Sequence, residues 1–148
     1  MPLILDMQGF KVEQNRFIVK ELAAYDGTKT AHYIFKAPFS VKLLSPDLQK
    51  QVTWLTNNYH CLNWNEGYTP FHKFSNIMKE LMEKKDVIYV KGKEKADYVR
   101  QYSPTVVYEL EEHPPLQIAE ARCFYHKKSK CMCALTNVFY LYETFIML

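Results

Sequence analysis

Residues 3–10 (LILDMQGF) decide the fold, because they form an apolar run that is broken at a glycine. A second apolar run covers residues 17–25 (FIVKELAAY), and a third stretch of β-forming residues covers residues 29–36. An Asp-Gly pair beginning at Asp26 separates the second run from the third, which is a strong hairpin signal. The start of the chain therefore predicts three antiparallel strands joined in chain order.

The hydrophobic period changes after residue 44. Ser45 and Pro46 are typical of a helix N-cap and a first helical position, and apolar residues then follow at helical spacing. A second amphipathic helix is predicted over residues 71–82, where apolar side chains recur every three or four positions. This block therefore predicts two consecutive helices.

The last third of the chain alternates between patterns typical of strands and patterns typical of helices. Residues 86–90 predict a buried strand, residues 106–110 predict a fifth strand, and residues 94–102 between them predict a short helix. A polar loop over residues 123–133 precedes an apolar final helix over residues 134–148. We therefore expect one α/β domain over residues 1–148. It would have a central mixed five-stranded sheet, an antiparallel three-strand start and helices on both faces.

Length and composition limit the classes of protein. The chain has 148 residues, of which 48% are hydrophobic, so it can bury a core. Only 4 glycines and 7 prolines argue against a disordered or collagen-like chain. Nineteen basic and 16 acidic residues give a net charge of +3, which is compatible with a nucleic-acid partner without indicating one. Neither a signal peptide nor a membrane segment is visible, so we expect an intracellular protein, cytoplasmic or nuclear, with no membrane partner.

Three of the four cysteines lie within eleven residues, close to His126. In a reducing compartment, such clustering favours a metal over a disulfide. The two-residue gap between Cys123 and His126 lets both bind one ion, and Cys131 or Cys133 can supply a third ligand. A fourth ligand is not local. The alternative is a loop whose cysteines simply pack or remain free.

The order of elements resembles the ribonuclease H-like fold, and in particular the DEDD family of 3′–5′ exonucleases. The family's Asp-x-Glu in the first strand corresponds here to Asp6-Met7-Gln8. Its next acid falls at Ala96, one position before Asp97, and its last acid falls at Asn137. Two-metal catalysis with Mg²⁺ or Mn²⁺ needs carboxylates. The resemblance thus implies a pseudo-nuclease with the relict site candidates Asp6, Gln8, Asp97 and Asn137.

The Maelstrom domain of piRNA-pathway proteins is similar to such an exonuclease without its acids, and it has a Glu-Cys-His-Cys zinc set. The segment from Cys123 to His126, and the Cys-Ala-Leu that begins at Cys133, match its pattern. Glu21 matches the position of the family's glutamate. The resemblance therefore implies a structural Zn²⁺ held by Glu21, Cys123, His126 and Cys133. His60 is a rival fourth ligand, and Cys131 is a rival of Cys133.

Basic residues gather in two loop-helix regions that, in the fold resembled, flank the entry of nucleic acid. They are Lys91, Lys93, Lys95, Arg100, Lys127, Lys128 and Lys130. Lysines near phosphates give sequence-independent affinity, and Tyr98, Tyr102, Phe124 and Tyr125 among them could stack on bases. The alternative is a solvated charged surface.

The resemblance therefore implies a zinc-containing, catalytically degenerate nuclease-like domain that binds RNA or single-stranded nucleic acid, with a role in RNA silencing or in a mobile-element or viral context. One alternative is an active Mg²⁺- or Mn²⁺-dependent nuclease that uses Asp6 with Glu94 or Asp97 and Glu13. Another is a protein-interaction module, with a protein partner or a second copy docked on the apolar C-terminal helix. We expect Trp54 and Trp64 to be core or helix-packing residues.

Overall fold

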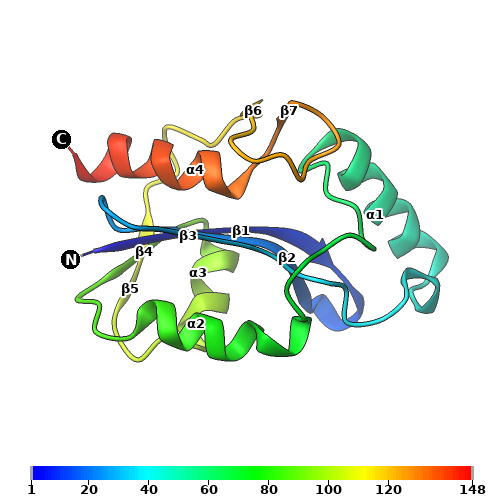
Figure 1. Ribbon diagram of the computed structural model, residues 1–148, viewed down its shortest axis with the longest axis horizontal. Coiled ribbons are helices and arrows are strands. Elements are labelled where there is room, and N and C mark those ends of the chain that lie inside the picture. Colours follow the sequence, from blue (N-terminus) through cyan, green and yellow to red (C-terminus); the bar gives the residue numbers. More distant parts are fainter. Residues whose placement is uncertain (1, 148) are drawn as a thin grey trace.

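The computed structural model describes residues 2–147 and has one five-stranded sheet between helices (Figure 1). The sheet order is β3-β2-β1-β4-β5. β1 pairs antiparallel with β2, and β2 pairs antiparallel with β3, whereas β4 and β5 extend the sheet in parallel from β1. The predicted α/β class, with a mixed five-stranded sheet and an antiparallel start, is confirmed. The strands are β1 (Leu3–Lys11), β2 (Phe17–Tyr25), β3 (Thr30–Ile34), β4 (Ile88–Lys91) and β5 (Val107–Leu110).

Four α-helices accompany the sheet: α1 (Pro46–Asn58), α2 (Phe74–Met82), α3 (Lys93–Arg100) and α4 (Ala134–Leu141). Figure 1 shows α2 and α3 on one face of the sheet and α4 on the other, with α1 beyond the end of the strands. Short 3₁₀ turns form at η1 (Glu13–Asn15), η2 (Val41–Leu43) and η3 (Phe71–Lys73). Within residues 2–147, none of the helices has the length and apolar content needed to cross a bilayer.

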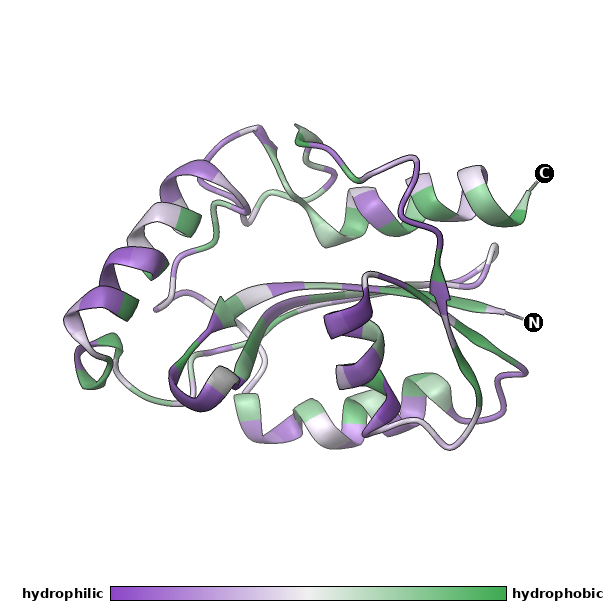
Figure 2. Ribbon diagram, turned by 180° about the vertical axis from the view of Figure 1, so that it is seen from behind, coloured by the Kyte–Doolittle hydropathy of each residue, from purple (hydrophilic) through white to green (hydrophobic). Residues whose placement is uncertain are grey.

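Alternation along the strands builds a core on each face of the sheet. Leu5, Met7 and Leu22 pack toward α2 and α3, whereas Ile4 and Ala23 pack against α4. In Figure 2 the strands and α4 are mostly hydrophobic, whereas α1 is largely hydrophilic. The buried apolar side chains of α4 therefore pack against the sheet. A protein partner docked on this helix stays a prediction.

A β-bulge between β1 and β2 places two charged residues in the interior. The register shifts after Gln8, so that Gly9 pairs with Val19 and Lys20 is the extra residue. A Cβ atom on Gly9 would lie 2.0 Å from the carbonyl oxygen of Ile18, so only glycine fits there. Glu21, the residue after the bulge, is fully buried.

Some boundaries and environments differ from the predictions. The final helix changes at residue 142 to a π-helical turn, η4 (Tyr142–Ile146), and position 148 lies outside the described residues. The predicted cysteine loop contains β7 (Lys130–Cys131), which pairs with β6 (Ala119–Glu120). Of the two environments expected for Trp54, the core is excluded. It is 56% exposed because it lies two positions from buried Val52, on the opposite side of α1. Trp64 is buried as expected.

Candidate metal centre

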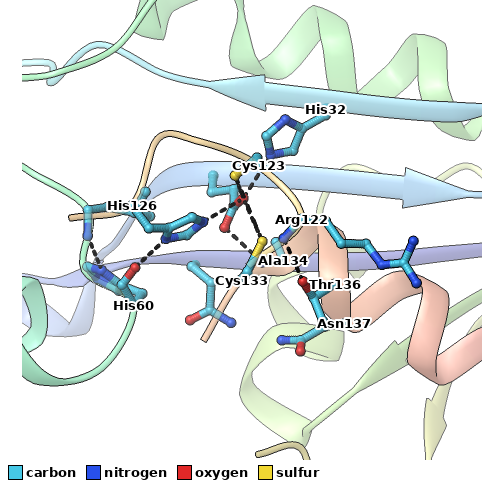
Figure 3. Close-up of polar contacts among 12 residues, drawn as sticks. His32, His60, Arg122, Cys123, His126, Cys133, Ala134, Thr136 and Asn137 are labelled. Atoms are coloured by element: carbon cyan, nitrogen blue, oxygen red, sulfur yellow. Dashed lines mark hydrogen bonds and ion pairs between the residues drawn. The ribbon is translucent and has the colours of Figure 1, made fainter. Parts of the chain in front are cut away.

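Four side chains from a strand, a loop and the start of a helix meet on the α4 side of the sheet. Glu21 comes from β2, Cys123 and His126 come from the loop between β6 and β7, and Cys133 is the N-cap residue of α4. One ligand atom from each lies within 4.8 Å of all the others, so the group could hold a metal ion. In Figure 3 the two sulfur atoms and the ring of His126 point toward one another.

The Glu21 carboxylate lies at the centre of this cluster. Its Oε2 atom is 3.4 Å from Sγ of Cys123, 3.6 Å from Sγ of Cys133 and 3.2 Å from Nε2 of His126. Its Oε1 atom accepts the backbone N–H of Ala134 at 2.8 Å. That N–H is one of the unpaired donors at the start of α4, so the carboxylate also caps the helix.

His32 of β3 is a further partner of Glu21 that the sequence gave no reason to single out. Its Nε2 atom lies 2.7 Å from Oε2 of Glu21, and its ring contacts that of Tyr125. Glu21 and His32 do not pair directly, because the register places Glu21 opposite Ile34 and His32 opposite Ala23. On neighbouring strands this two-residue offset leaves the two side chains on the same face of the sheet, within reach of each other.

His126 is oriented by the backbone of His60. Its Nδ1 atom donates to the carbonyl oxygen of His60, so Nε2 is the ring nitrogen left to bind a metal once it is deprotonated. Nε2 faces Glu21 and the two cysteines. A metal-binding histidine normally has such a partner on its other nitrogen, and this arrangement therefore suits ligation.

The environment of the cluster shifts the pKa values of its members. Burial raises the pKa of Glu21, but hydrogen bonds from His126 and His32 outweigh burial and hold it well below its usual range. Burial lowers the pKa of His126, but hydrogen bonds to the cysteines and to Glu21 raise it overall. The contact between the two sulfur atoms, 3.9 Å apart, raises the pKa of Cys123 and lowers that of Cys133 to about 4. The lowered pKa of Cys133 favours its thiolate, the form that binds metals.

Neither rival ligand joins the group. The ring of His60 is buried and uses both nitrogens elsewhere: Nε2 donates to the carbonyl of Gly9 at 2.9 Å, and Nδ1 accepts the N–H of Leu62 at 3.1 Å. Burial lowers the pKa of His60 to about 4, which keeps the ring neutral. Cys131 is buried beside Cys61 and Cys133 but lies outside the group that could hold an ion.

Three of the four relict nuclease candidates also meet, around Asp6. Its Oδ2 atom accepts the side-chain amides of Gln8 at 3.2 Å and Asn137 at 2.9 Å, while Nζ of Lys95 lies 2.9 Å from Oδ1. Asp97, the fourth candidate, is exposed and pairs with Arg100. An internal ammonium group thus neutralises the buried carboxylate.

The other acids considered for catalysis do not converge on Asp6. Glu94 forms an ion pair with Lys11 at 2.8 Å, and Oε1 of Glu13 accepts the N–H of Ser45. Both side chains are exposed. The structure therefore does not assemble the carboxylate set that two divalent cations would need.

The seven predicted nucleic-acid-binding residues divide into two groups. Near α3, Lys91 is buried, Lys95 binds Asp6 and Arg100 binds Asp97, which leaves Lys93 exposed without an ion pair among residues 2–147. In the loop that contains Cys123 and His126, the three lysines are exposed. They are Lys127, Lys128 and Lys130.

Comparison with models of known protein families, with curated proteins and with solved structures finds no match for this chain.

Proposed function

We propose that Glu21, Cys123, His126 and Cys133 bind one structural Zn²⁺. The observation that supports this most is the spacing of the ligand atoms. Tetrahedral zinc, with Zn–S of about 2.3 Å and Zn–N or Zn–O of about 2.0–2.1 Å, requires ligand atoms about 3.3–3.8 Å apart. Four of the six pairs of these atoms are 3.2, 3.4, 3.6 and 3.9 Å apart, and all six lie within 4.8 Å. Two sulfur atoms, one imidazole and one carboxylate are also ligand types that zinc accepts.

The proposed centre is structural because four protein ligands leave no position for a water nucleophile. When bound, zinc supplies a cross-link between its ligands. Glu21 joins that link to the sheet, Cys133 joins it to α4, and Cys123 and His126 join it to the loop. The loop has little regular structure of its own, so its conformation would depend on this link.

We further propose that the domain is a degenerate nuclease of the ribonuclease H-like, Maelstrom-like kind. The resemblance rests on the order of strands and helices along the chain. The structure has the same strands and helices in that order, and its sheet order is β3-β2-β1-β4-β5. Asp6, the surviving family acid, is neutralised by Lys95 and hydrogen-bonded by two amides, and the other acids lie elsewhere. These contacts favour a protein that binds nucleic acid without cleaving it.

The proposed activity is therefore binding of RNA or single-stranded nucleic acid, with RNA silencing as the setting that the resemblance suggests. Exposed lysines and aromatic rings in the loop that contains Cys123 and His126 support it, because these groups recognise phosphates and base faces. Fold similarity alone would not assign this activity.

The test is a fluorescence-anisotropy titration of a labelled single-stranded RNA over a salt series, with Mg²⁺ and Mn²⁺ added in a parallel set. The proposal predicts saturable binding at about 50 mM salt that weakens as salt rises, and intact RNA throughout. No binding at low salt would favour the protein-interaction alternative. Cleavage that is lost in Asp6→Ala would restore the nuclease alternative.

A further inference from the structure

The two basic regions differ in whether their charged side chains are bound to other groups of the protein or exposed without an ion pair. Around α3, three of the four basic residues are held by internal partners, and the rings of Tyr98 and Tyr102 are partly buried against the core. A pocket of about 590 Å³ lies there, but its charges are internally paired: Lys11 with Glu94, and Lys95 with Asp6. This side of the molecule offers little free positive charge or aromatic surface.

The loop between β6 and β7 presents exposed aromatic side chains instead. Phe124 is fully exposed, and Tyr125 is 40% exposed. The ring of Tyr125 lies 5.0 Å from that of Tyr68, which is 69% exposed and belongs to the neighbouring segment between α1 and α2. Tyr68 and Tyr125 are thus two large exposed rings in contact on adjoining segments, with exposed Phe124 next to Tyr125 in the chain. Exposed rings of this kind are groups on which nucleobases stack.

The Tyr68 segment is held in place from inside the molecule. The buried ammonium group of Lys20 donates to the carbonyl oxygens of Phe35, Trp64 and Glu66. These contacts fix the backbone just before Tyr68. The aromatic surface is therefore supported on both sides, by Lys20 and by the proposed metal centre.

A groove of about 580 Å³ with both polar and apolar side chains in its lining lies between the loop and α1. Lys127 belongs to both, because its Nζ atom lies 3.3 Å from Oδ1 of Asn57 in the groove wall, and its backbone N–H donates to the carbonyl of Cys61. Figure 1 shows the loop lying beside the end of α1. Side-chain amides and hydroxyls of the kind that hydrogen-bond base edges line the groove, including Thr53, Thr56, Asn57, Asn63 and Asn65.

The charge of this surface is mainly positive. Lys127, Lys128 and Lys130 are exposed and form no ion pair among residues 2–147, whereas Glu66 lines the groove and Glu120 lies opposite Lys130 in the β6–β7 pairing. Three lysines against two glutamates leave a positive balance beside exposed rings. That combination suits a single strand, whose phosphates bind lysines while its unpaired bases stack.

We propose that single-stranded nucleic acid binds along the surface formed by Tyr68, the Phe124–Lys130 loop and the Asn57–Glu66 groove, and not at the α3 side. We call this the loop surface. The proposal rests on the proposed nucleic-acid-binding function and specifies where that function is located. Because Cys123 and His126 belong to the same loop, the proposed zinc would hold the loop surface in its binding conformation.

The test compares matched variants of the full chain by anisotropy with labelled oligouridylate and oligodeoxythymidylate of about 12 nucleotides. The first loop variant is Lys127→Glu/Lys128→Glu/Lys130→Glu, and its control, with the same charge change on the α2–α3 side, is Lys73→Glu/Lys79→Glu/Lys93→Glu. The second loop variant is Tyr68→Ala/Phe124→Ala, and its control is Tyr108→Ala, an exposed tyrosine on β5. Thermal melting and zinc content of each variant identify any change of fold.

We expect both loop variants to bind at least about tenfold more weakly, while the controls bind like the wild type. The slope of log affinity against log salt should fall by about 2 in the lysine variant, since each phosphate contact on a single strand contributes about 0.7. Wild-type binding that the loop variants leave unchanged, or that the α2–α3 control weakens equally, would overturn the location but keep the proposed function. Absence of binding by the wild type would overturn both.

Discussion

Nζ of Lys95 lies 2.9 Å from Oδ1 of Asp6, so a side chain of α3 provides the cation that neutralises a fully buried carboxylate of β1. The other oxygen of Asp6 accepts the amides of Gln8 and Asn137. A nuclease would use such a carboxylate for a divalent cation, whereas here each oxygen has a protein partner.

Removing this carboxylate should destabilise the fold without affecting nucleic-acid binding. Asp6→Ala leaves the ammonium of Lys95 and two amides without an acceptor, and we expect a loss of about 2–4 kcal/mol in unfolding free energy by urea titration. The matched control is Asp97→Ala, which breaks the exposed pair with Arg100 and should cost less than about 1 kcal/mol. Equal losses in the two variants would show that Asp6 is not held as described.

His32 should tighten metal binding without being a ligand itself. Its contact with Oε2 of Glu21, at 2.7 Å, orients the carboxylate, and losing such a supporting contact typically lowers metal affinity about 10- to 100-fold. We expect that loss in His32→Ala, measured by zinc competition with a chelator. His32→Gln should recover part of it, because the amide can still donate.

The control for that experiment is His72→Ala, an exposed histidine of η3 that lies outside the metal cluster. Zinc affinity should be unchanged there. If His32→Ala also binds zinc like the wild type, His32 has no positioning role.

Acid should destabilise the protein through His60. Burial lowers the pKa of His60 from 6.5 to about 4, so the unfolded chain binds the extra proton between these values and the folded chain does not. The stability that comes from the neutral ring is thus complete above pH 6.5 and declines as pH falls toward 4, by at most about 3 kcal/mol.

Urea unfolding of the wild type and of His60→Gln, each across pH 4.5–7.5, isolates this effect, because any loss of metal in acid is common to both proteins. The variant should show a flatter pH profile than the wild type, and His72→Gln should keep the wild-type profile. Parallel profiles for the wild type and His60→Gln would contradict the assignment.

Local sequence patterns were enough to predict the five strands of the main sheet and the four α-helices. Hydrophobic periods and turn residues located the strands and α1, where the Ser45 side chain caps the helix by accepting the N–H of Leu48. The polarity of the cysteine loop concealed the short β6–β7 pair, and the apolar sequence after Leu141 concealed the change to a π-helical turn.

The candidate site was only partly accessible from sequence. Cys123, His126 and Cys133 are local, so their spacing was informative, whereas Glu21 is about a hundred positions away and was singled out through a resemblance. The roles of His32 and Lys95 could not be foreseen, because strand register and the docking of α3 create their contacts. The sequence also did not distinguish the exposed lysines of the loop, which form no ion pair among residues 2–147, from Lys95 near α3, which pairs with Asp6.

The proposed zinc centre is tested most directly by elemental analysis of the purified protein, of Cys133→Ser and of Cys131→Ser. Both substitutions replace a buried cysteine close to the cluster, but only Cys133 belongs to the group that could hold an ion. We predict close to one zinc per chain in the wild type and in Cys131→Ser, and loss of zinc in Cys133→Ser. A wild-type protein without zinc, or zinc retained in Cys133→Ser and lost in Cys131→Ser, would contradict the proposed centre.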